Sequence, residues 1–91
     1  MEGGVLMHAQ LWRYLSCLGN SKDALCICFR IVPAGRGSAF ECFDYDNGKL
    51  ESRGVYYMCP DCSREYLKLI NTQKRNGAPS LESQPKPPCQ L

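Results

Sequence analysis

The sequence lacks the features of a secreted or membrane-spanning chain. It has no apolar run of about eighteen residues, the minimum for a membrane-spanning helix. Its first eighteen residues have neither the basic start nor the long apolar centre of a secretory signal. The seven cysteines are odd in number. We therefore expect a cytoplasmic protein with no membrane partner, whose thiols are reduced and in part bind metal.

The sequence is equally poor in catalytic groups. The only histidine is His8, and a reactive cysteine would need a base of that kind. No phosphate-binding loop or paired-carboxylate motif is present. We expect neither catalysis nor a small-molecule substrate. The net charge of +2 is also too small to predict a nucleic-acid partner by itself, so that case depends on local clustering.

A chain of 91 residues allows one small domain, which buries only roughly 60–65% of its unfolded surface and would gain from a metal staple. We predict a compact α+β domain over residues 1–76. Residues 77–91 hold four of the six prolines and few apolar side chains, which predicts a disordered tail.

Two elements are predicted in the first third of the chain. Leucines at helical spacing, together with Trp12, indicate an amphipathic helix over Val5–Leu18. The apolar segment Asp23–Val32 is typical of a buried strand that Pro33 ends. Alternation in this strand would direct Leu25, Ile27, Phe29 and Ile31 to the core, and Cys26, Cys28 and Arg30 to the other face.

The second half predicts a hairpin followed by a helix. Ala39–Asp46 alternates like a strand, Asn47-Gly48 is a strong tight-turn signal, and Val55–Met58 is β-branched and aromatic. A helix is expected from Ser63 to about Lys74. The predicted fold is therefore a three-stranded antiparallel sheet packed on a C-terminal helix, with a looser N-terminal helix.

The sequence Cys59-Pro60-Asp61-Cys62 joins the last strand to this helix. Two-residue spacing suits tetrahedral chelation, most simply of zinc. Two of Cys17, Cys26 and Cys28 would complete the site, with His8 as a further option. In a regular strand the Cys26 and Cys28 sulfurs would lie roughly 6.5–7 Å apart, too far for one ion unless the chain bends. The alternative is that these cysteines are core or reactive thiols.

A second candidate site follows from basic and aromatic residues around Arg53-Gly54. A guanidinium beside a backbone without a Cβ lets a phosphate approach closely, and one of Tyr56 and Tyr57 can stack on a base. Residues 48–75 hold six basic and three acidic residues. The candidate RNA-binding residues are Lys49, Arg53, Gly54, Tyr56, Tyr57, Arg64, Lys68 and Arg75. The alternative is that Arg53 pairs with Glu51 or Asp61 while the tyrosines are core.

Residues 17–76 resemble the YlxR family of small bacterial RNA-binding proteins, which include a modulator of RNase P. The resemblance lies mainly in GKLESRGVYYMCP at residues 48–60, which is similar to the family's Gly-Lys-Leu-Pro-Gly-Arg-Gly-Ala-Tyr-hydrophobic-Cys-Pro signature. Cys17 and Phe29–Val32 match earlier parts of the pattern, whereas Tyr14 stands where the family has a first cysteine. The resemblance implies a protein that binds structured RNA or a ribonucleoprotein. A zinc-stabilised protein-interaction module is the competing interpretation.

Overall fold

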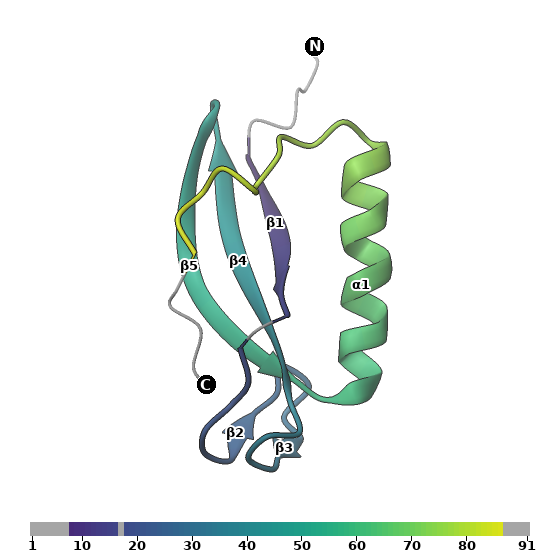
Figure 1. Ribbon diagram of the computed structural model, residues 1–91. Helices are drawn as coiled ribbons and strands as arrows, with labels where there is room; N and C mark the ends of the chain where they lie inside the picture. Colours follow the sequence, from purple (N-terminus) through teal and green to yellow (C-terminus); the bar gives the residue numbers. More distant parts are fainter. Residues whose placement is uncertain (1–7, 17, 87–91) are drawn as a thin grey trace.

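The computed structural model describes residues 8–16 and 18–86. It contains a three-stranded sheet, a small hairpin and one helix, arranged along the chain as β1 (His8–Leu15), β2 (Ala24–Leu25), β3 (Ile31–Val32), β4 (Ser38–Asp46), β5 (Lys49–Met58) and α1 (Pro60–Arg75) (Figure 1). The predicted α+β class is confirmed. Within the described part of the chain, no helix is long and apolar enough to cross a membrane.

The sheet has the strand order β1-β4-β5, and both pairings are antiparallel. The predicted turn joins β4 to β5, where Asn47 and Gly48 have φ values of 50° and 83°. The pairing register shifts between Cys42 and Phe43, where β5 contains one extra residue, Arg53. Such a bulge bends its strand and redirects the extra side chain.

The predicted N-terminal helix is wrong over the described residues, because His8–Leu15 forms strand β1. Leu11 and Leu15 are four residues apart, so they share a face in a strand as well as in a helix. Both faces of β1 are buried here: Trp12 packs toward α1 while Leu11 packs on the opposite side. The polar alternation that normally identifies a strand is therefore absent.

Helix α1 covers one face of the sheet through Tyr66 and Ile70, which pack on a buried cluster. That cluster consists of Trp12, Cys26, Val32, Phe40, Cys42, Met58 and Cys59. Gln73 of the helix also bonds the edge of β1. Its side-chain oxygen accepts the Trp12 N–H at 2.9 Å, and its side-chain nitrogen donates to the Trp12 carbonyl at 3.2 Å.

Residues 77–86, which the sequence assigns to a disordered tail, cross the sheet after the helix (Figure 1). Leu81 is only 8% exposed and packs on Leu11 and Phe43. The prediction followed from proline content and the scarcity of apolar residues. A single leucine is enough to anchor the segment because the backbone carbonyls of the tail also find donors.

Those donors belong to Arg13 on β1. Its guanidinium donates to the carbonyls of Leu81 at 2.6 Å, Gln84 at 3.0 Å and Pro85 at 3.0 Å, and it pairs with the carboxylate of Glu41. The Arg13 and Glu41 side chains are 2% and 6% exposed. A buried ion pair repays its desolvation only when further hydrogen bonds satisfy its charged groups. The tail supplies such bonds to the two terminal nitrogens of Arg13, whereas its buried Nε has no hydrogen-bond partner among the described residues.

We expect Arg13→Met to lower the free energy of unfolding by about 3–5 kcal/mol, because it leaves the Glu41 carboxylate buried without its partner. Urea denaturation followed by far-UV circular dichroism measures this change. Arg36→Met is the matched control, since Arg36 is exposed and such substitutions usually stay within about 0.5 kcal/mol. Equal denaturation midpoints for the two variants would contradict the role assigned to Arg13.

Candidate metal centre

The segment predicted as one strand over Asp23–Val32 is instead a tight hairpin, and that prediction was wrong. The Cys26 N–H donates to the Arg30 carbonyl at 2.8 Å, and the Phe29 N–H donates to the Cys26 carbonyl at 2.8 Å. Phe29 has a φ of 71°, which reverses the chain direction. This is the bend that Cys26 and Cys28 need to bind one ion.

The hairpin also changes which side chains face the core. Leu25 and Ile31 lie directly opposite each other and are 57% and 67% exposed, while Cys26 and Val32 are each 2% exposed. Ile27 still packs on the core cluster and Cys28 is exposed, because a turn replaces strand alternation over residues 26–30. The thiol of Cys26 thus occupies the core position that the sequence assigned to its apolar neighbours.

The second pair of thiols lies at the start of α1. Cys59 is the N-cap residue, Pro60 occupies the first turn, and Cys62 follows within that turn. The Cys59 N–H donates to the Cys26 sulfur at 3.3 Å, which ties the hairpin to the helix. The positive end of the helix dipole favours thiolates at this place.

These two elements bring four sulfur atoms together. The Sγ atoms of Cys26, Cys28, Cys59 and Cys62 all lie within 4.8 Å of one another. The Cys28 and Cys59 sulfurs are 3.7 Å apart. Four thiols at such distances could hold a metal ion. The predicted pair Cys59 and Cys62 therefore finds its partners in Cys26 and Cys28.

The thiols of the cluster differ in acidity. Burial raises the pKa of Cys26, but hydrogen bonds from the Cys28 and Cys59 backbones and from neighbouring thiols outweigh it and lower the pKa to about 7. Burial, followed by hydrogen bonds with the other three thiols, raises the pKa of Cys62 to about 12. The cluster thus favours ionisation of Cys26 over that of Cys62, and metal binding would release the protons that remain on the thiols.

The structure tests neither of the other predicted ligands. Cys17 and the side chain of His8 lie outside the described residues. Cys42 is buried in the sheet, where burial raises the pKa of its thiol. It belongs to the apolar core and is absent from the group of four.

Sequence reasoning missed Asn20, which holds the hairpin in place. Its side-chain nitrogen donates to the carbonyls of Lys22, Val32 and Pro33 at 2.9, 3.1 and 3.0 Å. Its side-chain oxygen accepts the Gly37 N–H at 3.0 Å. Asn20 directly follows the segment that the sequence predicts as a helix, and its bonds reach residues up to 17 positions away, so no local pattern identifies its role.

The predicted RNA-binding residues on β5 have mixed surroundings. Arg53 pairs with Asp44 at 3.4 Å, and its side chain is 59% exposed. Gly54 has a φ of 113° with open space around it, so a ligand could approach its backbone. Tyr56 is 38% exposed, and its ring lies 5.6 Å from that of Trp12. Tyr57 is half-buried on β5.

The basic residues predicted on the helix are exposed. Asp61 pairs with both Arg30 and Arg64, and Lys68 pairs with Glu65. The hydrogen bond from Arg30, together with the charge of Arg64, lowers the pKa of Asp61. Arg75 at the end of α1 and Lys49 at the start of β5 are exposed as well.

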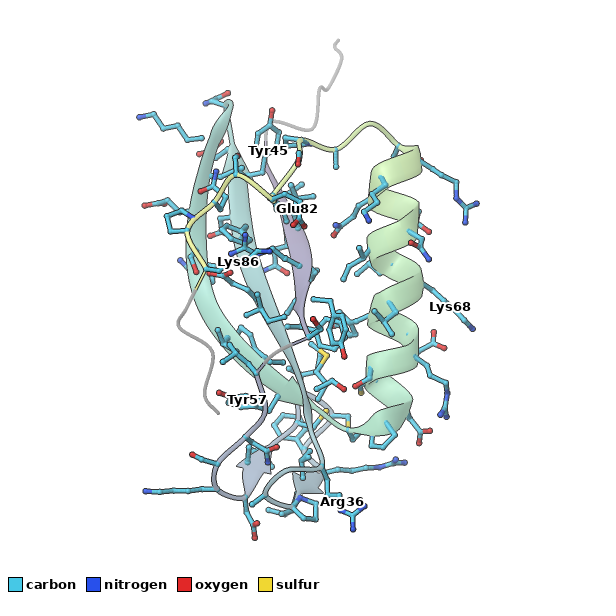
Figure 2. The ribbon with its side chains drawn as sticks, viewed as in Figure 1. Arg36, Tyr45, Tyr57, Lys68, Glu82 and Lys86 are labelled. Carbon is cyan, nitrogen blue, oxygen red and sulfur yellow. The ribbon has the colours of Figure 1, made fainter. Side chains whose placement is uncertain are left out.

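The structure does not gather all these candidates on one surface. Figure 2 shows Lys68 pointing outward from α1, whereas Tyr57 lies on the other side of the view, beyond the sheet. The candidates therefore divide into a helix group, Arg64, Lys68 and Arg75, and a β5 group, Lys49, Arg53, Gly54, Tyr56 and Tyr57.

A separate pocket of about 430 Å³ lies between β1, the end of α1 and the tail. Its lining includes Trp12, Tyr14, Gln73, Lys74 and Leu81, and none of the clustered cysteines.

The sequence matches no protein-family model, no curated protein and no solved structure.

We predict that the reduced protein binds one metal ion per chain and that Cys62→Ser weakens this binding strongly, because three thiols remain. Native mass spectrometry measures occupancy, and the melting temperature with and without a chelator measures its contribution to stability. The affinity for the metal should decrease as the pH is lowered, because protons then compete with the metal for the thiolates.

Cys42→Ala is the matched control, since it removes a buried thiol outside the cluster. It should retain the metal. Retention by Cys62→Ser at wild-type affinity, or loss by Cys42→Ala, would contradict the assignment of the four ligands.

Proposed function

We propose that the protein is a cytoplasmic, zinc-stabilised module that binds structured RNA without catalysing a reaction, within an RNA-processing, transcription or translation assembly. The observation that carries the proposal is the group of four cysteine sulfurs, with basic side chains exposed directly beside it. The cluster would fix the elements that carry these cations.

Zinc is the ion that suits the cluster best. Thiolate ligands favour soft or borderline ions, and tetrahedral sulfur sites in proteins usually hold zinc or iron. Zinc–sulfur bonds of about 2.3 Å place the sulfurs of a tetrahedron about 3.8 Å apart. The 3.7 Å between Cys28 and Cys59 agrees with this separation, and the 4.8 Å limit for the whole group needs only a small contraction.

RNA is supported by the charges around the cluster. Arg30 of the hairpin and Arg64 of the helix meet at Asp61, and Lys68 lies one helical turn beyond Arg64. Their side chains are 64%, 68% and 77% exposed. Phosphate contacts by such cations supply most sequence-independent affinity for nucleic acids. The similarity of residues 48–60 to the RNA-binding YlxR signature supports the same partner.

The metal identity is tested by elemental analysis of protein purified without added metal. We expect close to one zinc per chain, and a chelator should lower the melting temperature because the ion's binding energy stabilises this small fold. The same elemental analysis counts iron, and an iron content near zero excludes the iron form. A chain with neither zinc nor iron, and with a melting temperature that a chelator leaves unchanged, would overturn the metal assignment.

For RNA binding, we expect Lys68→Ala to weaken affinity and to reduce the salt slope by about one unit, the contribution of one phosphate contact. Fluorescence anisotropy with a folded RNA, at about 50 to 200 mM salt, measures both. Lys86→Ala is the matched control. It removes the same charge from the tail, which lies across the sheet from Lys68 in Figure 2.

Arg53→Ala tests the β5 group in the same assay. If Arg53 contacts a base, its loss should cost about 1–3 kcal/mol. Equal affinities of wild type and Arg53→Ala, with a clear effect of Lys68→Ala, would confine binding to the helix group. If the wild type binds no RNA at low salt, the proposed RNA-binding function is wrong.

The second candidate is a zinc-stabilised protein-interaction module. The exposed pair Leu25 and Ile31 favours it, since adjacent large apolar side chains on a surface often mark a protein contact. Salt separates the two functions. RNA affinity should fall steeply with ionic strength, whereas an apolar interface should barely respond.

A further inference from the structure

The most exposed large hydrophobic residue among the described residues is Phe29, at the tip of the β2–β3 hairpin. It is 81% exposed and lies in the left-handed region, with a φ of 71°. A bulky residue rarely adopts this conformation, and glycine would adopt it without strain. Neither the core nor the four-cysteine cluster therefore explains why phenylalanine occupies this position.

The hairpin that carries Phe29 also carries exposed apolar and cationic side chains. Leu25 and Ile31 are cross-strand partners, so their side chains share the outward face of the hairpin. Arg30 follows Phe29 and reaches Asp61, which also binds Arg64. The hairpin lies at one end of the molecule, where Figure 2 also places Arg36.

Phe29 directly precedes Arg30, whose side chain meets Arg64 of the helix at Asp61. Lys68 lies one helical turn beyond Arg64, and we call Arg30, Arg64 and Lys68 the cationic row. Asp61 and Glu65 neutralise part of its charge. The guanidinium of Arg30 has five N–H donors, and Asp61 takes one of them within the described contacts, so donors remain for a phosphate. An aromatic ring beside a row of cations is the usual design of single-strand binding surfaces.

We infer that an unpaired RNA base stacks on Phe29 while the adjoining phosphates contact Arg30 and continue along the cationic row. Leu25 and Ile31 flank the stacked base with apolar surface. This inference rests on the proposed RNA function and adds the part of the RNA that is recognised: a loop or single strand. A duplex offers no free base face, so it can bind the cationic row only.

The decisive variant is Phe29→Gly, because glycine fits the φ of 71° and the fold should be at least as stable. Fluorescence anisotropy with a roughly 12-nucleotide oligouridine should show a loss of affinity of about 5- to 150-fold, the range for loss of one base–aromatic stack. The salt slope should stay unchanged because the phosphate contacts remain. Phe29→Tyr should retain binding, and a blunt RNA duplex should bind wild type and Phe29→Gly equally.

Two further variants sharpen the test. Leu69→Ala removes an exposed apolar side chain from the helix and should leave oligouridine binding intact. Arg30→Gln should reduce the salt slope, since it removes a phosphate contact.

The outcomes separate this inference from the proposed function. Salt-dependent binding of oligouridine that is equal for wild type and Phe29→Gly would overturn the stacking role and leave RNA binding in place. No binding of oligouridine or folded RNA by the wild type would overturn both. Loss of binding with an unchanged Phe29→Gly melting temperature and an unchanged salt slope is the supporting result.

Discussion

The arrangement of the hairpin depends on four thiols that meet at the start of a helix. The sheet and α1 are held by an apolar core, but the β2–β3 hairpin contributes little more than Cys26 and Val32 to that core. Its position is fixed by the sulfur contacts of Cys26 and Cys28 with Cys59 and by the bonds of Asn20. Polar and sulfur-mediated contacts therefore replace apolar burial where the chain is too short to provide it, which is the usual difficulty of small domains.

The parts of the fold that the sequence predicted are those in which local signals agree. Strand β4, the Asn47-Gly48 turn and the helix after Cys59-Pro60-Asp61-Cys62 each have matching propensity, alternation or turn chemistry. The prediction for the β1 segment was wrong because this strand is covered on both sides and contains Arg13, a buried charge on a core face. The ion pair with Glu41 that makes this burial possible joins residues 28 positions apart, so no local pattern reveals it.

One half of the four-cysteine site could be predicted from the sequence, because it has a local signal, and the other half could not. Two-residue spacing identified Cys59 and Cys62, because chelation requires that geometry. Cys26 and Cys28 were recognised as candidates, but alternation placed Cys26 away from the core, since a tight turn interrupts the strand at this residue. The positive φ of Phe29 is the residue-level cause, and phenylalanine gives no sign of it in a sequence. Glycine or asparagine at a left-handed position indicates a turn in the sequence, whereas another residue at that position gives no such signal.

The contact between Gln73 and Trp12 has a consequence for the solubility of the folded chain. Strand β1 is an edge of the sheet, and the unpaired backbone groups of an edge can recruit a strand from another molecule. The side-chain amide of Gln73 presents the same donor and acceptor as a peptide group, and it occupies the Trp12 backbone from the helix side. Gln73 thus makes the two hydrogen bonds that a neighbouring strand would make at the centre of this edge. It thereby opposes pairing of the edge with a strand of another molecule, without adding another strand to the fold.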